Sequence, residues 1–320
     1  MPGAPGGTPK GILAGARAPP LASIRRHNAP PGKAGLMESR VLGPLRLIHN
    51  ERDITPHAPK IRPVLALLLM HARQVVGVDT IVEELWQENP PRSAVTTAQT
   101  YIYQMRKTFI NELGRKAGEL VIRTIPPGYV FGGENELDVT LFDQLVGEAQ
   151  RFRAAGRPEE CANRARRALS LWSGPALANV EKGELLQNFA THLEDKRLMA
   201  LELRIEAEML LGRHRELVSE LRTLVALHPF NEWFHSQLIT ALNAGGRRYE
   251  ALEAYRQVRT LLADELGLTP SIALQRLHQD ILVNGMRDDS PLAVPGQRAA
   301  GRREAPVPRR QPQFRQACPK

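Results

Sequence analysis

Side chains that can hydrogen-bond to nucleic-acid bases recur along one side of residues 92–111 (RSAVTTAQTYIYQMRKTFIN). At about 100° per residue, one face of a helix would carry Ser93, Thr96, Thr97, Thr100, Tyr103, Gln104 and Lys107. Glutamine can pair bidentately with adenine, threonine offers a hydroxyl and a methyl group, and lysine or arginine reaches guanine or phosphate. The segment has no aspartate or glutamate, which phosphate would repel. These residue types at this spacing predict a helix face suited to the major groove of DNA.

The opposite side of the same segment is apolar. Its residues, at intervals of 3, 4, 3 and 4, are Val95, Ala98, Ile102, Met105 and Phe109. We expect this stripe to be buried against the rest of a domain. Taken alone, the segment is more typical of an ordinary amphipathic surface helix, and the neighbouring elements reverse that preference.

Two further helices are predicted before this segment in the sequence. A short one is expected at residues 78–85, followed by a loop at residues 86–91 (WQENPP) whose two prolines cannot continue a helix. Ser93 is then a candidate N-cap for the long helix. An apolar helix is expected earlier, at residues 62–72, and its run VLALLLM is too short to span a bilayer.

Extended segments flank the three helices. Strands are predicted at residues 40–48 and in the segment up to residue 55. Residues 119–131 (ELVIRTIPPGYVF) place β-branched residues on both sides of a Pro-Pro-Gly turn, which predicts a hairpin. Together these elements form a winged helix-turn-helix, in which the third helix enters the groove and the hairpin is the wing. Arg92 and Arg123 are then expected on phosphate or at the minor-groove edge.

From residue 137 onward the sequence has helical periodicity and an internal repeat. The residues Ala207, Gly212, Arg213 and Glu216 recur 34 residues later as Ala241, Gly246, Arg247 and Glu250. This period is typical of the paired helices of tetratricopeptide repeats, and residues 156–159 (GRPE) resemble the same turn. We expect about three helical hairpins stacked into a short solenoid. Its groove could bind a partner or a second copy of the chain, or the array could only brace the neighbouring domain.

Ordered motifs in both halves resemble the SARP family of antibiotic-cluster activators. They are LGPL at 42–45, VLALLL at 64–69, EELW at 83–86, PPRSA at 90–94, TTAQTYIYQMR at 96–106, PGY at 127–129, ALSLWSGPAL at 168–177, LRIEAEMLLGRHRELVSEL at 203–221 and EALEAYRQVRTLLADELGLTPS at 250–271. The resemblance covers residues 38–285. Two residues depart from the family pattern, since Pro63 stands where Gln is expected and Pro127 where Gly is expected.

The resemblance implies a transcriptional activator that binds direct repeats in double-stranded DNA near a promoter, as a homodimer or as tandem copies, and recruits RNA polymerase. It also implies that the loop between the second and third helices faces away from the groove, where polymerase can reach it. The residues of this loop are Trp86, Gln87, Glu88 and Asn89. Glu88 is the cleaner candidate for a polymerase contact, because Trp86 could equally be a core residue.

The chain is long enough for two domains with sizeable cores, since 42% of its 320 residues are apolar. We expect a mainly α protein with a disordered basic extension at 1–37, the winged helix-turn-helix at 38–134, a tetratricopeptide-like bacterial transcriptional activation domain at 137–285 and a disordered basic tail at 286–320. The net charge of +9 comes mostly from the tails, because residues 1–40 and 286–320 carry +5 each. Overall charge therefore does not indicate a basic DNA-binding surface.

The sequence offers little that an enzyme would use. It has no GxxxxGK[ST] phosphate-binding motif, its nine histidines are scattered, and Cys161 and Cys318 indicate no disulfide. Acidic pairs such as Glu83 and Glu84 are interpreted as solvated charges. We expect no catalytic residue, metal, cofactor or membrane segment, and a cytoplasmic location at the nucleoid.

Two rival functions stay open at this stage. One is a helical-repeat adaptor whose winged helix contacts protein, and the other is an enzyme with an unrecognised site. An adaptor would tend to carry large apolar groups on the exposed face of residues 92–111, whereas a DNA-binding helix would keep that face polar.

Overall fold

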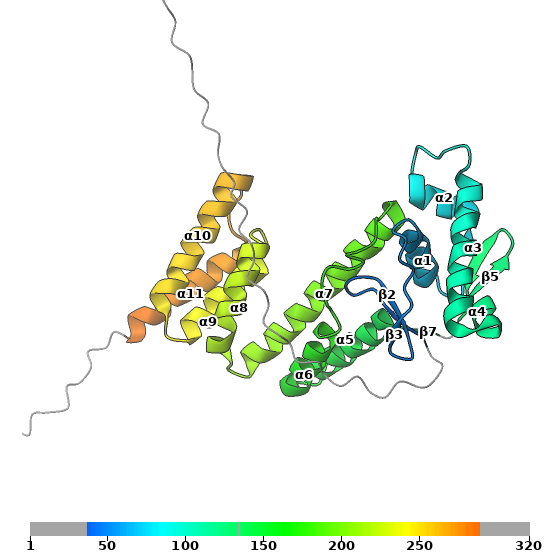
Figure 1. Ribbon diagram of the computed structural model, residues 1–320. Coiled ribbons are helices and arrows are strands. Elements are labelled where there is room, and N and C mark those ends of the chain that lie inside the picture. The colour runs from blue at the N-terminus through cyan, green and yellow to red at the C-terminus, as the bar shows by residue number, and fades with distance from the viewer. Residues whose placement is uncertain (1–36, 134, 289–320) are drawn as a thin grey trace, which may run out of the picture. The chain divides into compact units, whose positions relative to one another are not determined.

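The computed structural model describes residues 37–133 and 135–288. These residues divide into two compact units, one ending at Gly212 and the other beginning at Arg213 (Figure 1). The predicted disordered segments lie almost entirely outside the described residues. At their inner ends the prediction was wrong, because Met37 begins a strand and residues 286–288 complete a helix.

The first unit opens with a small sheet. Its strands are β1 (Met37–Arg40), β2 (Arg46–His49), β3 (Arg52–Asp53) and β7 (Asn135–Leu137). They lie in the order β3-β2-β1-β7, with β1 antiparallel to β2 and parallel to β7. Strands do lie before the first helix, but the prediction of one strand at residues 40–48 was wrong, because residues 41–45 form a turn between β1 and β2. Strand β7 joins the sheet from further along the chain, where Asn135 accepts a hydrogen bond from Ser39, 96 residues earlier.

Four helices and a second sheet complete the winged helix. The helices are α1 (Ile61–Met70), α2 (Val78–Trp86), α3 (Ala94–Leu113) and α4 (Arg115–Val121). The strands are β4 (Val76–Gly77), β5 (Ile122–Ile125) and β6 (Gly128–Phe131), in the order β4-β6-β5. The hairpin β5–β6 is the predicted wing, and α3 is the predicted long helix (Figure 1).

The short helix α4 was not predicted, because the sequence analysis assigned residues 119–131 to the hairpin alone. Gly114 separates α3 from α4 with a φ of 78°, a conformation that side-chain-bearing residues rarely adopt. Gly118 then lets α4 lie close to α3, since a Cβ there would stand 2.5 Å from the backbone of Ile110. The β-branched pattern thus begins to form a strand only at Ile122.

The remaining elements are helices, as the sequence predicts. They are α5 (Asp138–Ala154), α6 (Pro158–Leu169) and α7 (Glu184–Leu210) in the first unit, and α8 (His214–Leu227), α9 (Glu232–Ala244), α10 (Arg248–Leu266) and α11 (Ile272–Asp288) in the second. The three repeated turn glycines, Gly156, Gly212 and Gly246, have φ values of 65°, 75° and 79°. Each turn therefore needs the same left-handed residue, which explains the repeat seen in the sequence.

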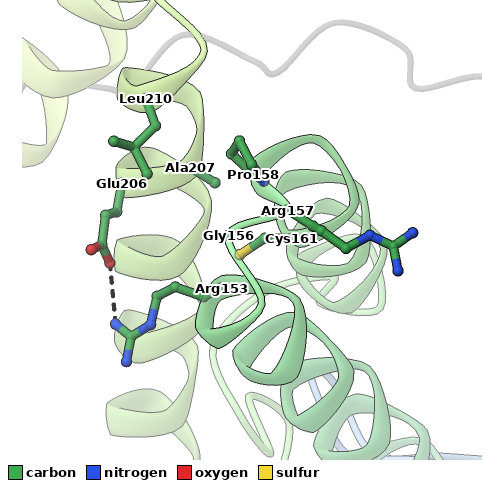
Figure 2. Close-up of a pocket in the computed structure, with 8 residues that line it drawn as sticks. All are labelled: Arg153, Gly156, Arg157, Pro158, Cys161, Glu206, Ala207 and Leu210. Carbon is green, nitrogen blue, oxygen red and sulfur yellow. Dashed lines mark hydrogen bonds and ion pairs between the residues drawn. The ribbon is translucent and has the colours of Figure 1, made fainter.

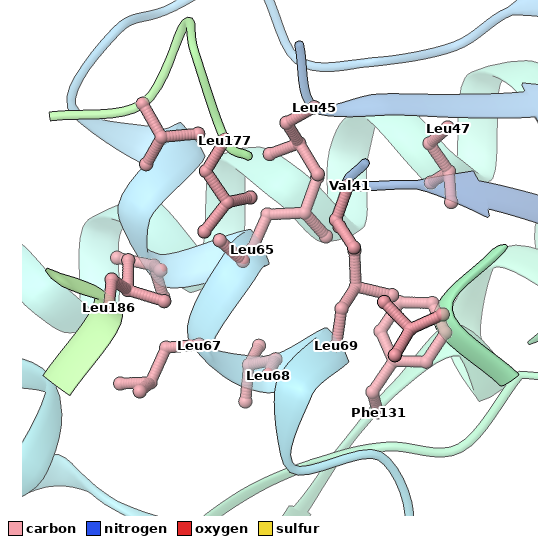
Figure 3. Close-up of a cluster of buried hydrophobic side chains, with 14 of the residues drawn as sticks. Val41, Leu45, Leu47, Leu65, Leu67, Leu68, Leu69, Phe131, Leu177 and Leu186 are labelled. Carbon is pink, nitrogen blue, oxygen red and sulfur yellow. The ribbon is translucent and has the colours of Figure 1, made fainter. Parts of the chain in front are cut away.

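The winged helix and helices α5–α7 share one hydrophobic core. Figure 3 shows Leu177, from the segment before α7, near Leu45 and Leu65 of the winged helix, and Leu186, from the first turn of α7, on the side of Leu67. The backbone is also paired across this boundary, because the N–H of Leu177 donates to the carbonyl of Val41 at 3.1 Å. The first unit is therefore a single folded body that contains both the winged helix and the helices α5–α7.

Two carboxylates, of the half-buried Asp138 and the buried Glu84, accept hydrogen bonds across the same boundary. Asp138 accepts hydrogen bonds from the N–H groups of Val41 and Leu42 at 2.9–3.1 Å, and its burial raises its pKa to about 6. Glu84 of α2 accepts from the N–H groups of Gly183 and Leu185 at 2.6 and 2.9 Å, at the start of α7. The interpretation of Glu84 as a solvated charge was wrong, since its side chain is buried and caps another helix.

Candidate nucleic-acid interface

The long helix α3 buries one stripe and exposes the other side, as its periodicity predicts. The buried residues are Ala94, Ala98, Ile102, Met105 and Phe109. The prediction that Val95 belongs to this buried stripe was wrong, because 46% of its surface is exposed. Ala94, one position earlier, faces inward instead, and the two residues differ by about 100° around the helix.

The polar residues predicted to meet DNA lie together on the exposed side of α3 and just before it. Arg92, Ser93, Thr96, Thr100, Tyr103, Gln104 and Lys107 are exposed, and Thr97 is half-buried. Tyr103 has 66% of its surface exposed. The hydroxyl of Thr100 donates to the carbonyl of Thr96 at 2.8 Å, so its proton is directed back to the helix and its methyl group and lone pairs stay available.

Ser93 differs from its expected capping role, and Arg123 lies on the wing. Ser93 occupies the N-cap position, but its side chain makes no capping hydrogen bond. Arg123 is exposed on β5, and its Nε would stand 2.7 Å from a Cβ at Gly132, so the side chain lies over that glycine. Because side chains alternate along a strand, Arg123 lies on the opposite face of the hairpin from Thr124.

The sequence analysis missed Arg106, which joins α3 to the wing. Its Nε donates to the carbonyl of Ile122 at 3.0 Å, and its Nη2 donates to the hydroxyl of Thr124 at 2.8 Å. Its Cζ lies 5.6 Å from the centre of the Tyr129 ring on β6. Its role could have been predicted from its position one residue after Met105, at the border between the buried and exposed faces of the helix. A long side chain at such a border can reach a neighbouring element.

The loop between α2 and α3 projects its central residues into solvent. Trp86 is half-buried as the last residue of α2, whereas Gln87, Glu88 and Asn89 are exposed. Gln87 has a φ of 52°, and its N–H donates to the carbonyl of Glu83 at 2.8 Å. The loop thus leaves α2 by a sharp turn that directs Glu88 away from the core.

A cavity of about 300 Å³ lies elsewhere in the first unit, between the turn that joins α5 to α6 and helix α7 (Figure 2). Arg153 pairs with Glu206 at 3.1 Å across one side of it, while Arg157 pairs with Glu160. Cys161 forms part of its wall, and burial raises the pKa of this thiol, which disfavours the reactive thiolate. The Cys161 thiol therefore lacks the features of an activated nucleophile.

No group of three or more metal-ligating side chains is found in residues 37–133 and 135–288, and none of their helices has the length and apolar character needed to cross a bilayer. His235 is buried, and its Nε2 lies 2.9 Å from the carbonyl of Pro229. Burial lowers the pKa of this histidine, consistent with a core residue.

Comparison with known proteins gives consistent matches. The family model described as "Bacterial transcriptional activator domain" matches residues 137–282. The regulatory protein DnrI of Streptomyces peucetius is 40% identical over 250 residues, which are 77% of this chain and 92% of DnrI. The regulatory protein AfsR of Streptomyces griseus is 35% identical over 84% of this chain, but this chain spans only 26% of AfsR.

A solved structure shows the same architecture. The structure of EmbR from Mycobacterium tuberculosis, in complex with a low-affinity phosphopeptide, matches with a TM-score of 0.72 at 32% sequence identity. The match covers 78% of this chain and 66% of the EmbR chain. The winged helix and the helical domain described above thus occur together in a named transcriptional regulator. With its activation-domain match and its identity to DnrI, the chain belongs to the SARP family of DNA-binding transcriptional activators.

Proposed function

We propose that this activator reads its operator through the exposed face of α3, with Thr96, Thr97, Thr100, Gln104 and Lys107 in the major groove. Arg92, Ser93 and Tyr103 would flank them. The observation that carries the proposal is the contrast between the two sides of α3, one closed by apolar packing and the other polar and without an acidic residue from 92 to 111. Such a face suits DNA better than the apolar surface of a protein partner.

The likeness to DnrI and AfsR supports a finer assignment. We infer that the chain activates the genes of a secondary-metabolite cluster, and that two copies bind direct repeats near the promoter. Half-sites one helical turn of DNA apart would present both copies on the same side of the duplex. Such an activator would work at the nucleoid in the cytoplasm.

The base-reading role is tested by footprinting and titration on DNA upstream of neighbouring genes. Gln104→Ala should relax preference at one base position, because a lost bidentate contact costs roughly 1–3 kcal/mol of discrimination. Gln99→Ala is the matched control, since Gln99 is also exposed on α3 but lies about 140° away around the helix. An unchanged preference in Gln104→Ala would place base reading elsewhere.

Lys107 tests phosphate contact on the same face. Lys107→Ala should weaken binding to all sequences and reduce the slope of log affinity against log salt by about one. Lys107→Arg keeps the charge and should keep the slope. If Lys107→Ala retains the wild-type slope, this side chain does not meet the DNA backbone.

We further propose that the loop after α2 contacts RNA polymerase through Glu88. This residue is exposed beyond the sharp turn at Gln87, and the loop lies beside the start of α3. Glu88→Lys should leave operator affinity nearly intact while lowering transcription in a reconstituted assay, and Glu88→Gln should have a smaller effect. Equal transcription by wild type and Glu88→Lys at equal operator occupancy would instead favour a contact on the helices after Leu137.

A further inference from the structure

One side chain of α3, Arg106, makes two hydrogen bonds to the wing. We propose that Arg106 is a positioning residue, which fixes the hairpin β5–β6 relative to α3 so that wing and helix meet the same DNA in register. This inference rests on the proposed function. Arg106 is not one of the polar residues on α3 that are proposed to meet DNA.

The contacts of Arg106 reach both strands of the hairpin. Ile122 and Thr124 are two residues apart on β5, so both their side chains lie on the same side of that strand. Tyr129 is the partner of Thr124 on β6, and its ring lies near the same guanidinium. The planar fork of an arginine can make these contacts together, whereas a lysine ammonium cannot reproduce them.

The outer strand of the hairpin is the part on which this contact acts, because residues 123–125 of β5 are exposed while β6 is buried. Each strand has four residues, and β5 is the edge strand of the sheet β4-β6-β5. The carbonyls on the outer edge of β5 therefore lack partners in the sheet. Arg106 donates a hydrogen bond to one of these carbonyls, that of Ile122. Its second hydrogen bond, to the Thr124 hydroxyl, lies closer to the exposed residues of the wing tip.

Both hydrogen-bond acceptors of Arg106 are neutral, so they do not compensate its positive charge. Across the described ranges, no carboxylate within ion-pair distance of Arg106 is found. A substitution that removes this charge would therefore change long-range attraction to DNA as well as the position of the wing. The experiment must separate these two effects.

The test uses the full chain and the DNA fragment that the wild-type protein protects, with hydroxyl-radical footprinting and titration at several salt concentrations. Arg106→Gln and Thr124→Val should each lose the protection that the wing gives to the flanking sugars, while protection at the α3 site remains. Operator affinity should fall about five- to tenfold, as expected for the loss of one or two hydrogen bonds. The double variant should be little weaker than Arg106→Gln, because both changes break the same tie.

Two further variants isolate position from charge. Arg106→Lys keeps the charge, so it should lose wing protection and keep the salt slope. Lys107→Gln, the adjacent exposed residue, should lower the salt slope by about one and keep wing protection. Wing protection that persists in Arg106→Gln would overturn the positioning role, as would a uniform loss of protection over both sites. A wild-type protein that gives no footprint on any fragment would overturn the proposed function itself, and the role of Arg106 with it.

Discussion

Replacing Ile102 with aspartate should unfold the whole unit that ends at Gly212, rather than the winged helix alone. Ile102 is 1% exposed, and its helix packs against α1 and α2. A carboxylate buried there without a partner should destabilise the native state by several kcal/mol. Because α5–α7 share this core, they should lose their packing in the same transition.

Trp172 gives a direct measurement of that expectation. It is buried in the shared core, far along the chain from Ile102, and its ring packs edge-to-face on Phe142 with centroids 5.7 Å apart. In a full chain with Trp86→Phe and Trp233→Phe, tryptophan fluorescence reports only Trp172. Ile102→Asp should shift its unfolding to much lower urea concentration, whereas Gln99→Asp, on the exposed part of α3, should shift it little. A wild-type Trp172 transition in Ile102→Asp would mean that the winged helix unfolds by itself.

Replacing Glu84 with alanine should give the second large effect. Its carboxylate accepts hydrogen bonds from the N–H groups of Gly183 and Leu185, and Leu186 lies 3.4 Å from both of its oxygens. Without an acceptor, each buried N–H group costs about 1–3 kcal/mol. The free energy of unfolding of the first unit, measured by urea titration followed by circular dichroism, should therefore fall by several kcal/mol.

The neighbouring residue provides the matched control for Glu84. Glu83 has the same side chain but is exposed, so Glu83→Ala should change the unfolding free energy little. Glu84→Gln keeps one acceptor oxygen and should lie between the two. Gly183→Ala should also destabilise, because a Cβ there would stand 2.2 Å from the carbonyl oxygen of Glu84. Equal stability of Glu83→Ala and Glu84→Ala would show that the cap contributes nothing.

Local patterns in the sequence predicted the elements of the site well. The 3.6-residue period identified the buried side of α3, and the Pro-Pro-Gly turn between β-branched residues identified the wing. Such patterns depend only on near neighbours along the chain. The repeated glycines were found for the same reason, since each hairpin turn sets its own backbone requirement.

The roles of Glu84 and Arg106 and the helix α4 were not predicted, because each depends on a contact between separate elements and not on the periodicity of one element. Glu84 resembles Glu83 in type and setting, and only the start of α7, about 100 residues later, makes it a buried cap. Arg106 becomes a tie only when β5 lies beside α3. The helix α4 depends on the close approach of Gly118 to Ile110. No periodicity of charge or hydropathy records these pairings.

The separation of the two faces of α3 also bears on how such regulators diverge. The buried stripe belongs to a core that extends into the activation domain, so a change there disturbs many contacts at once. The exposed residues Thr96, Gln104 and Lys107 carry no part of that packing, and surface substitutions of this kind usually alter stability by less than about 0.5 kcal/mol. Duplicated genes could therefore acquire new operators by changing a few side chains, while the scaffold and its joint to the activation domain are inherited intact.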